Sequence, residues 1–330
     1  MKVSVIGAGS WGTVLSQILN DNGHDVLLWA RNKEKAAEMN ASRCNADYLP
    51  DLKLADNITV SNDLELAVKT GELLVLVVPA KGMRQIVASI GKIADCSDKI
   101  ILSCTKGFDL LTMESMSTVI RKGLPLAAQI AVMSGPNLAV ELSQRQPAAT
   151  VIASSNEETV SLLQGVFINN YFRPYTSNDV LGVELCGSLK NTIALVSGML
   201  SGLHFGENSE AALITRGLAE ITRLGVKIGA QKGTFSGLAG VGDLIATCTS
   251  PKSRNHRAGL ALAQGKTAEE IIASTHMVIE GIDTTKAIHA LAKKYNVEMP
   301  ISEALFQVLF QGLGVNEALN KLMNRTGKQE

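Results

Sequence analysis

Short apolar runs alternate with amphipathic stretches through the first half of the chain. Runs rich in β-branched residues predict strands at 3–6, 25–29, 58–60, 73–78, 99–103, 129–133 and 150–153. Helical spacing of apolar positions lies between most of these runs, and such alternation predicts a parallel sheet with helices on both faces. A run at 171–175 would add a strand at the sheet edge, because Pro174 has no N–H to give to a central ladder.

The pattern changes after about residue 176, where strand-like runs fade and helical spacing takes over. Apolar positions at 185, 189, 193, 196 and 200 predict a long helix. Further helices are predicted at 211–224, 257–263, 268–273, 284–294 and 302–310. We therefore expect an α/β protein with a doubly wound domain over residues 1–178 and an all-α domain over 179–330.

Composition narrows the class of protein. Hydrophobic residues make up 46% and charged residues 19%, which is ordinary for a soluble globular protein. The 31 basic residues balance 31 acidic ones, so no global field favours nucleic acid or an anionic membrane. The longest apolar run, Leu73 to Ala80, is too short to span a bilayer, which argues against stable membrane insertion.

Cysteines and histidines give no sign of a covalent framework or a metal site. The five cysteines lack a C-x-x-C pair and are expected to be small apolar fillers in a reducing, cytoplasmic compartment. The histidines lack the spacing of metal ligands, so no metal is expected. These histidines are His24, His204, His256, His276 and His289.

A glycine motif follows the first predicted strand. Gly7, Gly9 and Gly12 form G-x-G-x-x-G between this strand and an apolar helix, which is the context that gives the motif its meaning. Gly7 permits the sharp turn, Gly9 lets the backbone approach a pyrophosphate, and Gly12 lets helix and strand pack closely. The helix N-terminus then presents N–H donors and its positive dipole to the phosphates. The pattern predicts a Rossmann-like dinucleotide-binding domain.

The end of the second strand indicates which dinucleotide is bound. NAD-specific folds commonly place Asp or Glu here for the ribose 2′-hydroxyl, and the segment Leu28–Asn32 has none. Arg31 can instead pair with a 2′-phosphate. We expect NADP(H) to be accepted, with NAD(H) not excluded; a solvated arginine at a helix start is the simpler alternative.

Three later loops follow predicted strands, at the edge where doubly wound sheets bind ligands. Pro79 would end one strand and form the floor of the ligand-binding crevice, and Lys106 would lie at this crevice. Gly135 and Asn137 can offer backbone and amide donors to an oxygen-rich substrate. A surface lysine is the alternative for Lys106.

The helical half contains a lysine and a carboxylate in apolar surroundings. Lys190 shares a helix face with small residues, which would partly desolvate it and lower its pKa toward the range useful for proton transfer. Asp243 lies in the glycine-rich segment Gly240–Leu244 and could support such a lysine. The alternatives are a snorkelling lysine and a helix N-cap.

A basic turn spans residues 250–257. Ser253, Arg254 and Asn255 precede a predicted helix and suit phosphate binding at its N-terminus. A solvated basic turn is the alternative.

Taken together, these segments make the chain resemble the bacterial type of NAD(P)-dependent glycerol-3-phosphate dehydrogenase. The matching motifs run nearly end to end, and the later blocks are the most specific. They are GAGSWGT at 7–13, SCTKG at 103–107, SGPNLAVE at 134–141, GSLKN at 187–191, GENSEAALITRGLAE at 206–220, GVGDLIATCTSPKSRNHR at 240–257 and VIEGIDTTKA at 278–287.

The resemblance implies roles that the residues alone only suggest. Lys190 would exchange the proton at the C2 oxygen of the substrate, with Asp243 close by. Lys106, Gly135, Asn137, Ser253, Arg254 and Asn255 would contact the phosphorylated small-molecule substrate. The cofactor site would comprise Gly7, Gly9, Ser10, Trp11, Gly12, Arg31, Lys106, Ala139, Arg254, Val278 and Glu280. The product, sn-glycerol 3-phosphate, would feed glycerophospholipid synthesis.

The chain departs from the family pattern at three positions. Asn137 stands where Ser or Thr is usual, Leu138 where Phe is common, and Ser188 replaces Ala or Thr beside the lysine. An Asn amide still donates a hydrogen bond, so the role of position 137 is weakened rather than lost. The long apolar helices of the second half favour a homodimer.

Two other functions remain open at this point. A β-hydroxyacid dehydrogenase shares the two-domain plan and a lysine on its first long helix, but its substrate carries a carboxylate rather than the phosphate that the turn at 253–255 suits. A regulator that senses NAD(P) without turnover would have no use for Lys106, Lys190 and Asp243.

Overall fold

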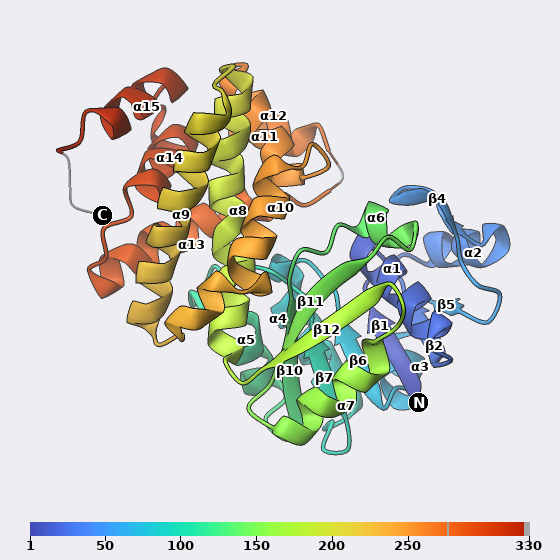
Figure 1. Ribbon diagram of the computed structural model, residues 1–330. Coiled ribbons are helices and arrows are strands. Elements are labelled where there is room, and N and C mark those ends of the chain that lie inside the picture. The colour runs from blue at the N-terminus through green and yellow to red at the C-terminus, as the bar shows by residue number, and fades with distance from the viewer. Residues whose placement is uncertain (276, 327–330) are drawn as a thin grey trace. The chain divides into compact units, whose positions relative to one another are not determined.

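The computed structural model describes residues 1–275 and 277–326, and the chain divides into two compact units (Figure 1). Unit 1 comprises Met1–Asp109 and Glu114–Glu184, and unit 2 comprises Leu110–Met113 and the chain from Leu185 onward. Unit 1 contains an eight-stranded sheet with helices, and the secondary structure of unit 2 is helical. The expectation of an α/β half followed by an all-α half is confirmed.

The sheet of unit 1 has its first strand in an interior position. Its order is β12-β11-β10-β7-β6-β1-β2-β5. The strands are β1 (Lys2–Ile6), β2 (Asp25–Trp29), β5 (Thr59–Ser61), β6 (Leu73–Leu76), β7 (Ile100–Ser103), β10 (Gln129–Ser134), β11 (Ala148–Ala153) and β12 (Phe172–Ser177). The chain runs outward from β1 to β5 and then returns to β6 on the other side of β1. The topological switch point therefore lies between β1 and β6, where open α/β sheets bind their ligands.

One pairing differs from the predicted parallel sheet. β11 runs antiparallel to β10, while β12 is parallel to β11 and lies at the edge, as the proline in its run predicted. The only helix between β10 and β11 is α6 (Ala139–Ser143), which is five residues long. A helix of this length spans less than 10 Å, too little to carry the chain back along the sheet for a parallel crossover.

Helices cover both faces of this sheet. α1 (Ser10–Asp21) and α7 (Glu157–Phe167) pack in one core through Leu15, Ile18 and Phe167. α3 (Leu64–Thr70), α4 (Ala80–Ile93) and α5 (Met116–Gly123) pack in the other through Val68 and Met83 among others. Pattern analysis missed the strands of two small hairpins, because three of them are two residues long and the fourth, LPDLK, does not alternate between buried and exposed positions. These are β3 (Cys44–Asn45) with β4 (Leu49–Lys53), and β8 (Phe108–Asp109) with β9 (Glu114–Ser115). α2 (Lys33–Ser42) completes the elements of unit 1.

Unit 2 is built from long helices and several short ones. The predicted helices are present as α8 (Val180–Gly202), α9 (Glu207–Ile228), α11 (Arg254–Ala263), α12 (Ala268–Ala273), α13 (Glu280–Tyr295) and α14 (Pro300–Gln311). α10 (Asp243–Thr249) and α15 (Val315–Met323) were not predicted. α10 follows a 3-10 turn (Lys232–Ser236) and a π-helical turn (Leu238–Gly242), whose glycines obscure the helical period.

The most apolar helix is part of the core. Within the described residues, α8 is the one helix long and apolar enough to cross a membrane, and 83% of its most apolar 18-residue window is buried inside the protein. Its apolar character is therefore explained by burial in a helical core.

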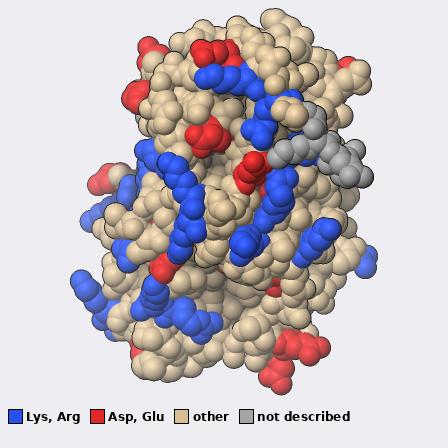
Figure 2. Space-filling view, turned by 90° about the vertical axis from the view of Figure 1, so that its left-hand side faces the viewer, with Lys and Arg blue, Asp and Glu red and all other residues tan. Residues whose placement is uncertain are grey.

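Charged side chains of both signs share the molecular surface. Figure 2 shows Lys and Arg as well as Asp and Glu on the face turned to the viewer. This mixture agrees with the balanced composition, and recognition of an anion must depend on local arrangements of donors.

Glu220 on α9 is a buried carboxyl that caps another helix. Its side chain, 2% exposed, accepts N–H bonds from Ile301 at 2.7 Å and Ser302 at 3.3 Å, in the first turn of α14. Burial raises the pKa of Glu220 to about 7, although these hydrogen bonds favour the charged form.

We expect the stability of the protein to fall as pH rises from about 4.5 to about 7. In this window the folded protein keeps a proton on Glu220 that the unfolded chain, with its ordinary pKa of 4.5, releases. The shift corresponds to about 3 kcal/mol. Urea unfolding between pH 5 and pH 8 should show this slope in the wild type and a flatter profile in Glu220→Gln. Glu207→Gln, an exposed glutamate on the same helix, should retain the wild-type slope; an unchanged slope in Glu220→Gln would contradict the assignment.

Candidate active site

The glycine turn lies at the switch point of the sheet. Gly7 has φ 124°, a conformation that L side chains rarely adopt, and a Cβ there would lie 2.6 Å from the carbonyl oxygen of Val77. The N–H of Gly7 donates to the carbonyl of Trp29 on β2 at 3.0 Å. The turn therefore fits tightly between the ends of β2 and β6, and only glycine is compatible with that position.

The next two glycines have different surroundings. A Cβ on Gly12 would lie 1.9 Å from the carbonyl oxygen of Gly7, so Gly12 is required for the close approach of α1 to the turn. A Cβ on Gly9 would meet no protein atom within 4 Å. Gly9 also has an ordinary extended backbone (φ −80°, ψ −177°) and no side chain caps α1 there. Neither the backbone conformation nor the protein packing requires a glycine at position 9. A ligand that approaches the start of α1 closely would require one. These residues fit a dinucleotide pyrophosphate.

Unit 1 contains further residues that we predicted to contact the cofactor. Arg31 follows β2 directly and is exposed, just before Asn32 caps α2. Ser10 and Trp11 form the first turn of α1 and are partly buried, and the Trp11 ring packs edge-on against Phe172 at 6.3 Å. Ala139 begins α6 and packs against the core that contains α1. Trp11 thus has a packing partner inside unit 1 as well as a partly exposed surface.

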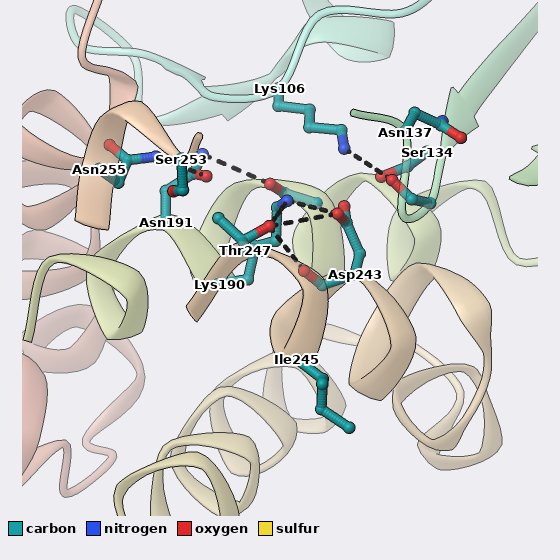
Figure 3. A network of polar contacts seen from close by, with 12 residues as sticks. Lys106, Ser134, Asn137, Lys190, Asn191, Asp243, Ile245, Thr247, Ser253 and Asn255 are labelled. Carbon is teal, nitrogen blue, oxygen red and sulfur yellow. Dashed lines mark hydrogen bonds and ion pairs between the residues drawn. The ribbon is translucent and has the colours of Figure 1, made fainter. Parts of the chain in front are cut away.

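The strand-end loops of unit 1 form a second polar group. The Lys106 ammonium donates to the carbonyl of Gly135 at 3.1 Å, and Figure 3 shows the Lys106 side chain pointing toward Ser134. The Asn137 amide donates to the Thr150 hydroxyl at 2.9 Å, and that hydroxyl donates to the carbonyl of Ser134 at 3.2 Å. The Asn137 amide, which we expected to face a substrate, therefore has a hydrogen-bond partner within unit 1. Sequence reasoning missed Thr150, which no motif singles out.

In unit 2, Lys190 on α8 lies beside Asp243 and Thr247 on α10, and Figure 3 shows the three side chains pointing toward one another. Lys190 is 5% exposed. Its ammonium donates to Asp243 Oδ1 at 2.5 Å and to the hydroxyl of Thr247. That hydroxyl in turn donates to the backbone carbonyl of Asp243 at 2.6 Å. Burial leaves the ammonium few alternatives to these two partners, and their positions define its orientation.

Thr247 was missed by the sequence analysis, although a signal for it existed. Asp243 and Thr247 are four residues apart, so both side chains lie on one face of any helix that contains them. Because α10 was not predicted, the sequence analysis did not place Asp243 and Thr247 on one helix face. The carboxylate itself lies in the first helical turn and contacts the lysine, rather than capping the helix.

The basic turn of unit 2 begins α11. Ser253 is its N-cap, and its hydroxyl oxygen accepts the N–H of His256 at 3.2 Å. The N–H groups of Arg254 and Asn255 fall in the first turn, where a helix provides no acceptor. The Arg254 guanidinium donates to the carbonyl of Val278 at 2.9 Å. A helix N-terminus with a serine and an arginine is an arrangement that binds phosphate.

The side chain of Asn255 has two partners within unit 2. It is 8% exposed, donates to Asn191 Oδ1 at 3.0 Å and accepts the N–H of Gly281 at 3.0 Å. Glu280, another predicted cofactor residue, is the first residue of α13 and directly precedes Gly281. The segment 278–281 therefore contacts both Arg254 and Asn255.

Most of the cysteines are buried, and none forms a disulfide. Cys96, Cys104, Cys186 and Cys248 are buried and Cys44 is partly buried, all as free thiols. Burial raises the pKa of the Cys104 thiol and raises that of Cys248 to about 12, so these two thiols stay protonated. Within residues 1–275 and 277–326, no three His, Cys, Asp or Glu side chains form a group that could hold a metal ion; His276 lies outside the described residues.

The fold of unit 1 and the lysine–carboxylate pair of unit 2 define a nicotinamide-dependent oxidoreductase. Residues 2–160 match the family described as NAD-dependent glycerol-3-phosphate dehydrogenase N-terminus, and residues 179–320 match the corresponding C-terminus. The chain belongs to the NAD-dependent glycerol-3-phosphate dehydrogenase family, as the resemblance of its motifs predicted.

Relatives match over the full length. Glycerol-3-phosphate dehydrogenase [NAD(P)+] of Streptococcus sanguinis is 46% identical, covering 100% of this chain and 97% of the relative. The enzyme of the same name from Macrococcus caseolyticus is 42% identical, with 100% of both chains covered. Among solved structures, the glycerol-3-phosphate dehydrogenase of Coxiella burnetii is 35% identical, with a TM-score of 0.94 over 98% of this chain and 99% of that one. The β-hydroxyacid dehydrogenase and the non-catalytic regulator are therefore not supported.

Proposed function

We propose that this protein catalyses reversible hydride transfer between NAD(P)H and dihydroxyacetone phosphate, with sn-glycerol 3-phosphate as the product, the reaction classed as EC 1.1.1.94. The observation that carries the proposal is the buried Lys190, held by Asp243 and Thr247, in a chain of this family. A buried ammonium with defined partners is suited to exchange a proton with one oxygen atom of a substrate.

The dinucleotide, when bound, supplies the hydride in the reduction of the ketone. The residues proposed to bind it come from both units. They are Gly7, Gly9, Ser10, Trp11, Gly12, Arg31, Lys106 and Ala139 of unit 1, and Arg254, Val278 and Glu280 of unit 2. The open space at Gly9 and the uncapped N-terminus of α1 support this assignment for the pyrophosphate.

On the protein side, Lys190 donates a proton to the C2 oxygen as negative charge develops there, and takes it back in the oxidation. The ammonium stabilises the charge before the proton moves, which adds to acid catalysis. Asp243 balances the buried ammonium and holds its direction, and the Thr247 hydroxyl fixes a second hydrogen bond. The carboxylate thereby keeps Lys190 oriented while a neutral ketone approaches.

The phosphate of the substrate is assigned to the N-terminus of α11. Ser253 and Arg254, with the backbone N–H of Asn255, are the proposed donors, and Lys106, Gly135 and Asn137 are the proposed contacts from unit 1. Three kinds of donor on a phosphate would discriminate against a substrate that carries a carboxylate or no anion at all.

The domain organisation and cellular setting belong to the same proposal. We assign cofactor binding to a domain of residues 1–178 and substrate binding to a domain of residues 179–330. The protein is proposed to be a cytoplasmic homodimer that supplies glycerol 3-phosphate for glycerophospholipid synthesis. The balance of 31 basic and 31 acidic residues agrees with this setting.

The direct test is NADPH oxidation on addition of dihydroxyacetone phosphate, followed by the loss of absorbance of the reduced nicotinamide. We expect turnover with dihydroxyacetone phosphate and none with unphosphorylated dihydroxyacetone. No turnover of the phosphorylated substrate with either NADPH or NADH would refute the proposed function.

Arg31→Ala should change the cofactor preference without changing the chemistry. Its guanidinium is the proposed partner of the 2′-phosphate, and a charged hydrogen bond of this kind contributes about 1.5–3 kcal/mol. We expect the KM for NADPH to rise by roughly tenfold or more while the KM for NADH stays unchanged. Steady-state kinetics with both cofactors measures this ratio, and an unchanged ratio would contradict the 2′-phosphate contact. Lys33→Ala, at the exposed first position of α2, serves as the matched control.

A further inference from the structure

A buried hydroxyl group holds the loop that follows β10 in unit 1. Thr150 on β11 is 0% exposed, and its hydroxyl donates to the carbonyl of Ser134 at 3.2 Å and accepts a hydrogen bond from the Asn137 amide at 2.9 Å. Ser134 is the last residue of β10, and Asn137 lies in the loop between β10 and α6. The hydroxyl therefore joins the start of this loop to a point three residues further along the chain.

These bonds extend the contact between the two strands beyond their ladder. The antiparallel ladder of β10 and β11 has its last pair at Ser134 and Val151. In the same register, the next residue of β11, Thr150, is opposite Gly135. A Cβ on Gly135 would lie 2.9 Å from Thr150 Cα and 3.1 Å from Thr150 Oγ1. The backbone of the loop therefore lies directly against β11 at this position.

The same glycine provides an acceptor for Lys106. Its carbonyl accepts a hydrogen bond from the Lys106 ammonium at 3.1 Å, and the lysine points toward this end of β10 in Figure 3. Gly135 has no side chain that could hold the peptide groups on either side of it, and glycine has more backbone freedom than any other residue. The bonds from Thr150 to Ser134 and Asn137 restrict the chain on both sides of Gly135. The direction of the Gly135 carbonyl thus depends on the Thr150 hydroxyl.

We propose that Thr150 is a positioning residue, which orients the Gly135 carbonyl and through it the Lys106 ammonium for its contact with the substrate. This inference rests on the proposed function, and it adds a buried residue that itself contacts neither substrate nor cofactor. Asn137 keeps its proposed contact with the substrate and is in addition the second anchor of the loop. An ammonium has three N–H donors and no fixed plane, so the acceptors around it set its direction.

Removal of the hydroxyl weakens this arrangement without changing Lys106 itself. Thr150→Val keeps the branched shape of the side chain, and it leaves the Ser134 carbonyl and the Asn137 amide without this partner in buried or partly buried surroundings. Polar groups in this state favour a rearrangement of the loop that gives them other partners or water. The Gly135 carbonyl then turns, and the Lys106 ammonium loses one of the acceptors that orient it.

A matched control exists near the opposite end of the same two strands. Ser154 directly follows β11 and is 1% exposed. Its hydroxyl donates to the carbonyl of Ile130 on β10 at 3.0 Å and accepts the N–H of Asn156 at 3.3 Å. Ser154→Ala therefore removes a buried hydroxyl that makes the same two kinds of bond, at a β10 residue about 13 Å along the strand from Ser134. Thr150→Ser is the conservative variant, which retains the hydroxyl.

Each variant is assayed for kcat/KM with dihydroxyacetone phosphate at saturating NADPH, over substrate concentrations that extend below KM, and for its melting temperature. We expect Thr150→Val to lower kcat/KM by about tenfold through a rise in KM, because a misdirected charged hydrogen bond loses much of its contribution to binding. Thr150→Ser should stay within about threefold of the wild type. Ser154→Ala should lower the melting temperature about as much as Thr150→Val and leave kcat/KM unchanged.

A double-mutant cycle tests whether the effect depends on Lys106. Lys106→Met removes the ammonium and should lower kcat/KM by more than Thr150→Val does. Adding Thr150→Val to Lys106→Met should then lower kcat/KM by less than about twofold, because the group that Thr150 positions is already absent.

Wild-type kcat/KM in Thr150→Val or in Lys106→Met would overturn the proposal. An equal loss in Thr150→Ser or in Ser154→Ala would also overturn it, since the hydroxyl or its location would then not matter. A full tenfold loss on adding Thr150→Val to Lys106→Met would show that Thr150 acts independently of the lysine. If Thr150→Val does not fold, the smaller variant Thr150→Ala is used in every comparison. A wild-type protein that does not reduce dihydroxyacetone phosphate would instead refute the proposed function.

Discussion

Lys190→Met is expected to lower kcat for dihydroxyacetone phosphate reduction by about a thousandfold. General acid catalysis contributes on the order of 10²- to 10⁴-fold, and the ammonium is also the proposed stabiliser of charge at the C2 oxygen. The variant keeps an unbranched side chain that is one atom shorter and removes the ammonium group. Steady-state kinetics at saturating NADPH measures the loss, and a kcat within tenfold of the wild type would exclude the role given to Lys190.

Stability must be separated from chemistry in this experiment. Asp243 is 2% exposed and pairs with the ammonium, so Lys190→Met leaves a buried carboxylate without its partner. Breaking a buried pair in this way costs about 3–5 kcal/mol. The double variant Lys190→Met/Asp243→Asn removes both charges and should recover much of the stability but none of the activity. Lys227→Ala, an exposed lysine on α9, should be close to wild type in both.

Gly12→Ala is expected to destabilise the protein by about 3 kcal/mol or more and to abolish dinucleotide binding. Its Cβ would lie 1.9 Å from the carbonyl oxygen of Gly7, so α1 must move away from the turn and from the core beneath it. Thermal unfolding measures the first effect, and titration with NADPH measures the second. Wild-type stability in Gly12→Ala would show that the close helix–turn contact is not required.

Gly9→Ala is the matched control for Gly12→Ala, in the same glycine motif. No protein atom lies within 4 Å of its Cβ, so we expect a melting temperature near that of the wild type. The methyl group would nevertheless occupy the space proposed for the pyrophosphate and raise the Kd for NADPH by tenfold or more. Unchanged NADPH affinity in Gly9→Ala would place the pyrophosphate elsewhere.

The sheet could be predicted in detail because its strands are buried runs with a clear period. All eight strands of the main sheet were found, and Pro174 correctly indicated an edge strand. The direction of β11 was not predicted, since strand direction depends on how the connection packs and not on the strand itself. The short hairpins and α10 were missed, because two-residue strands and glycine-rich turns carry little periodicity.

For the candidate site, residue types were predictable and their hydrogen-bond partners were not. The spacing of SCTKG, GSLKN and the segment 240–257 indicated Lys106, Lys190 and Asp243 from sequence alone. Thr247 required the helix that places it four residues from Asp243 on the same face. Asn255 was predicted as a phosphate ligand in a basic turn, and only the structure shows that its amide also bonds to Asn191 and Gly281.

The sequence by itself determined the alternating strands and helices of the first half, the glycine turn, the helical second half and the family. These properties depend on local periodicity, on backbone conformations that only glycine allows, and on motifs of fixed spacing. The tertiary structure alone decided the antiparallel β11, the pairing of Lys190 with Asp243 and Thr247, and the hydrogen bonds of the Asn255 amide to Asn191 and Gly281. Each of these depends on contacts between residues more than a dozen positions apart, or on a helix too irregular to be recognised, and only packing brings such groups within hydrogen-bonding distance.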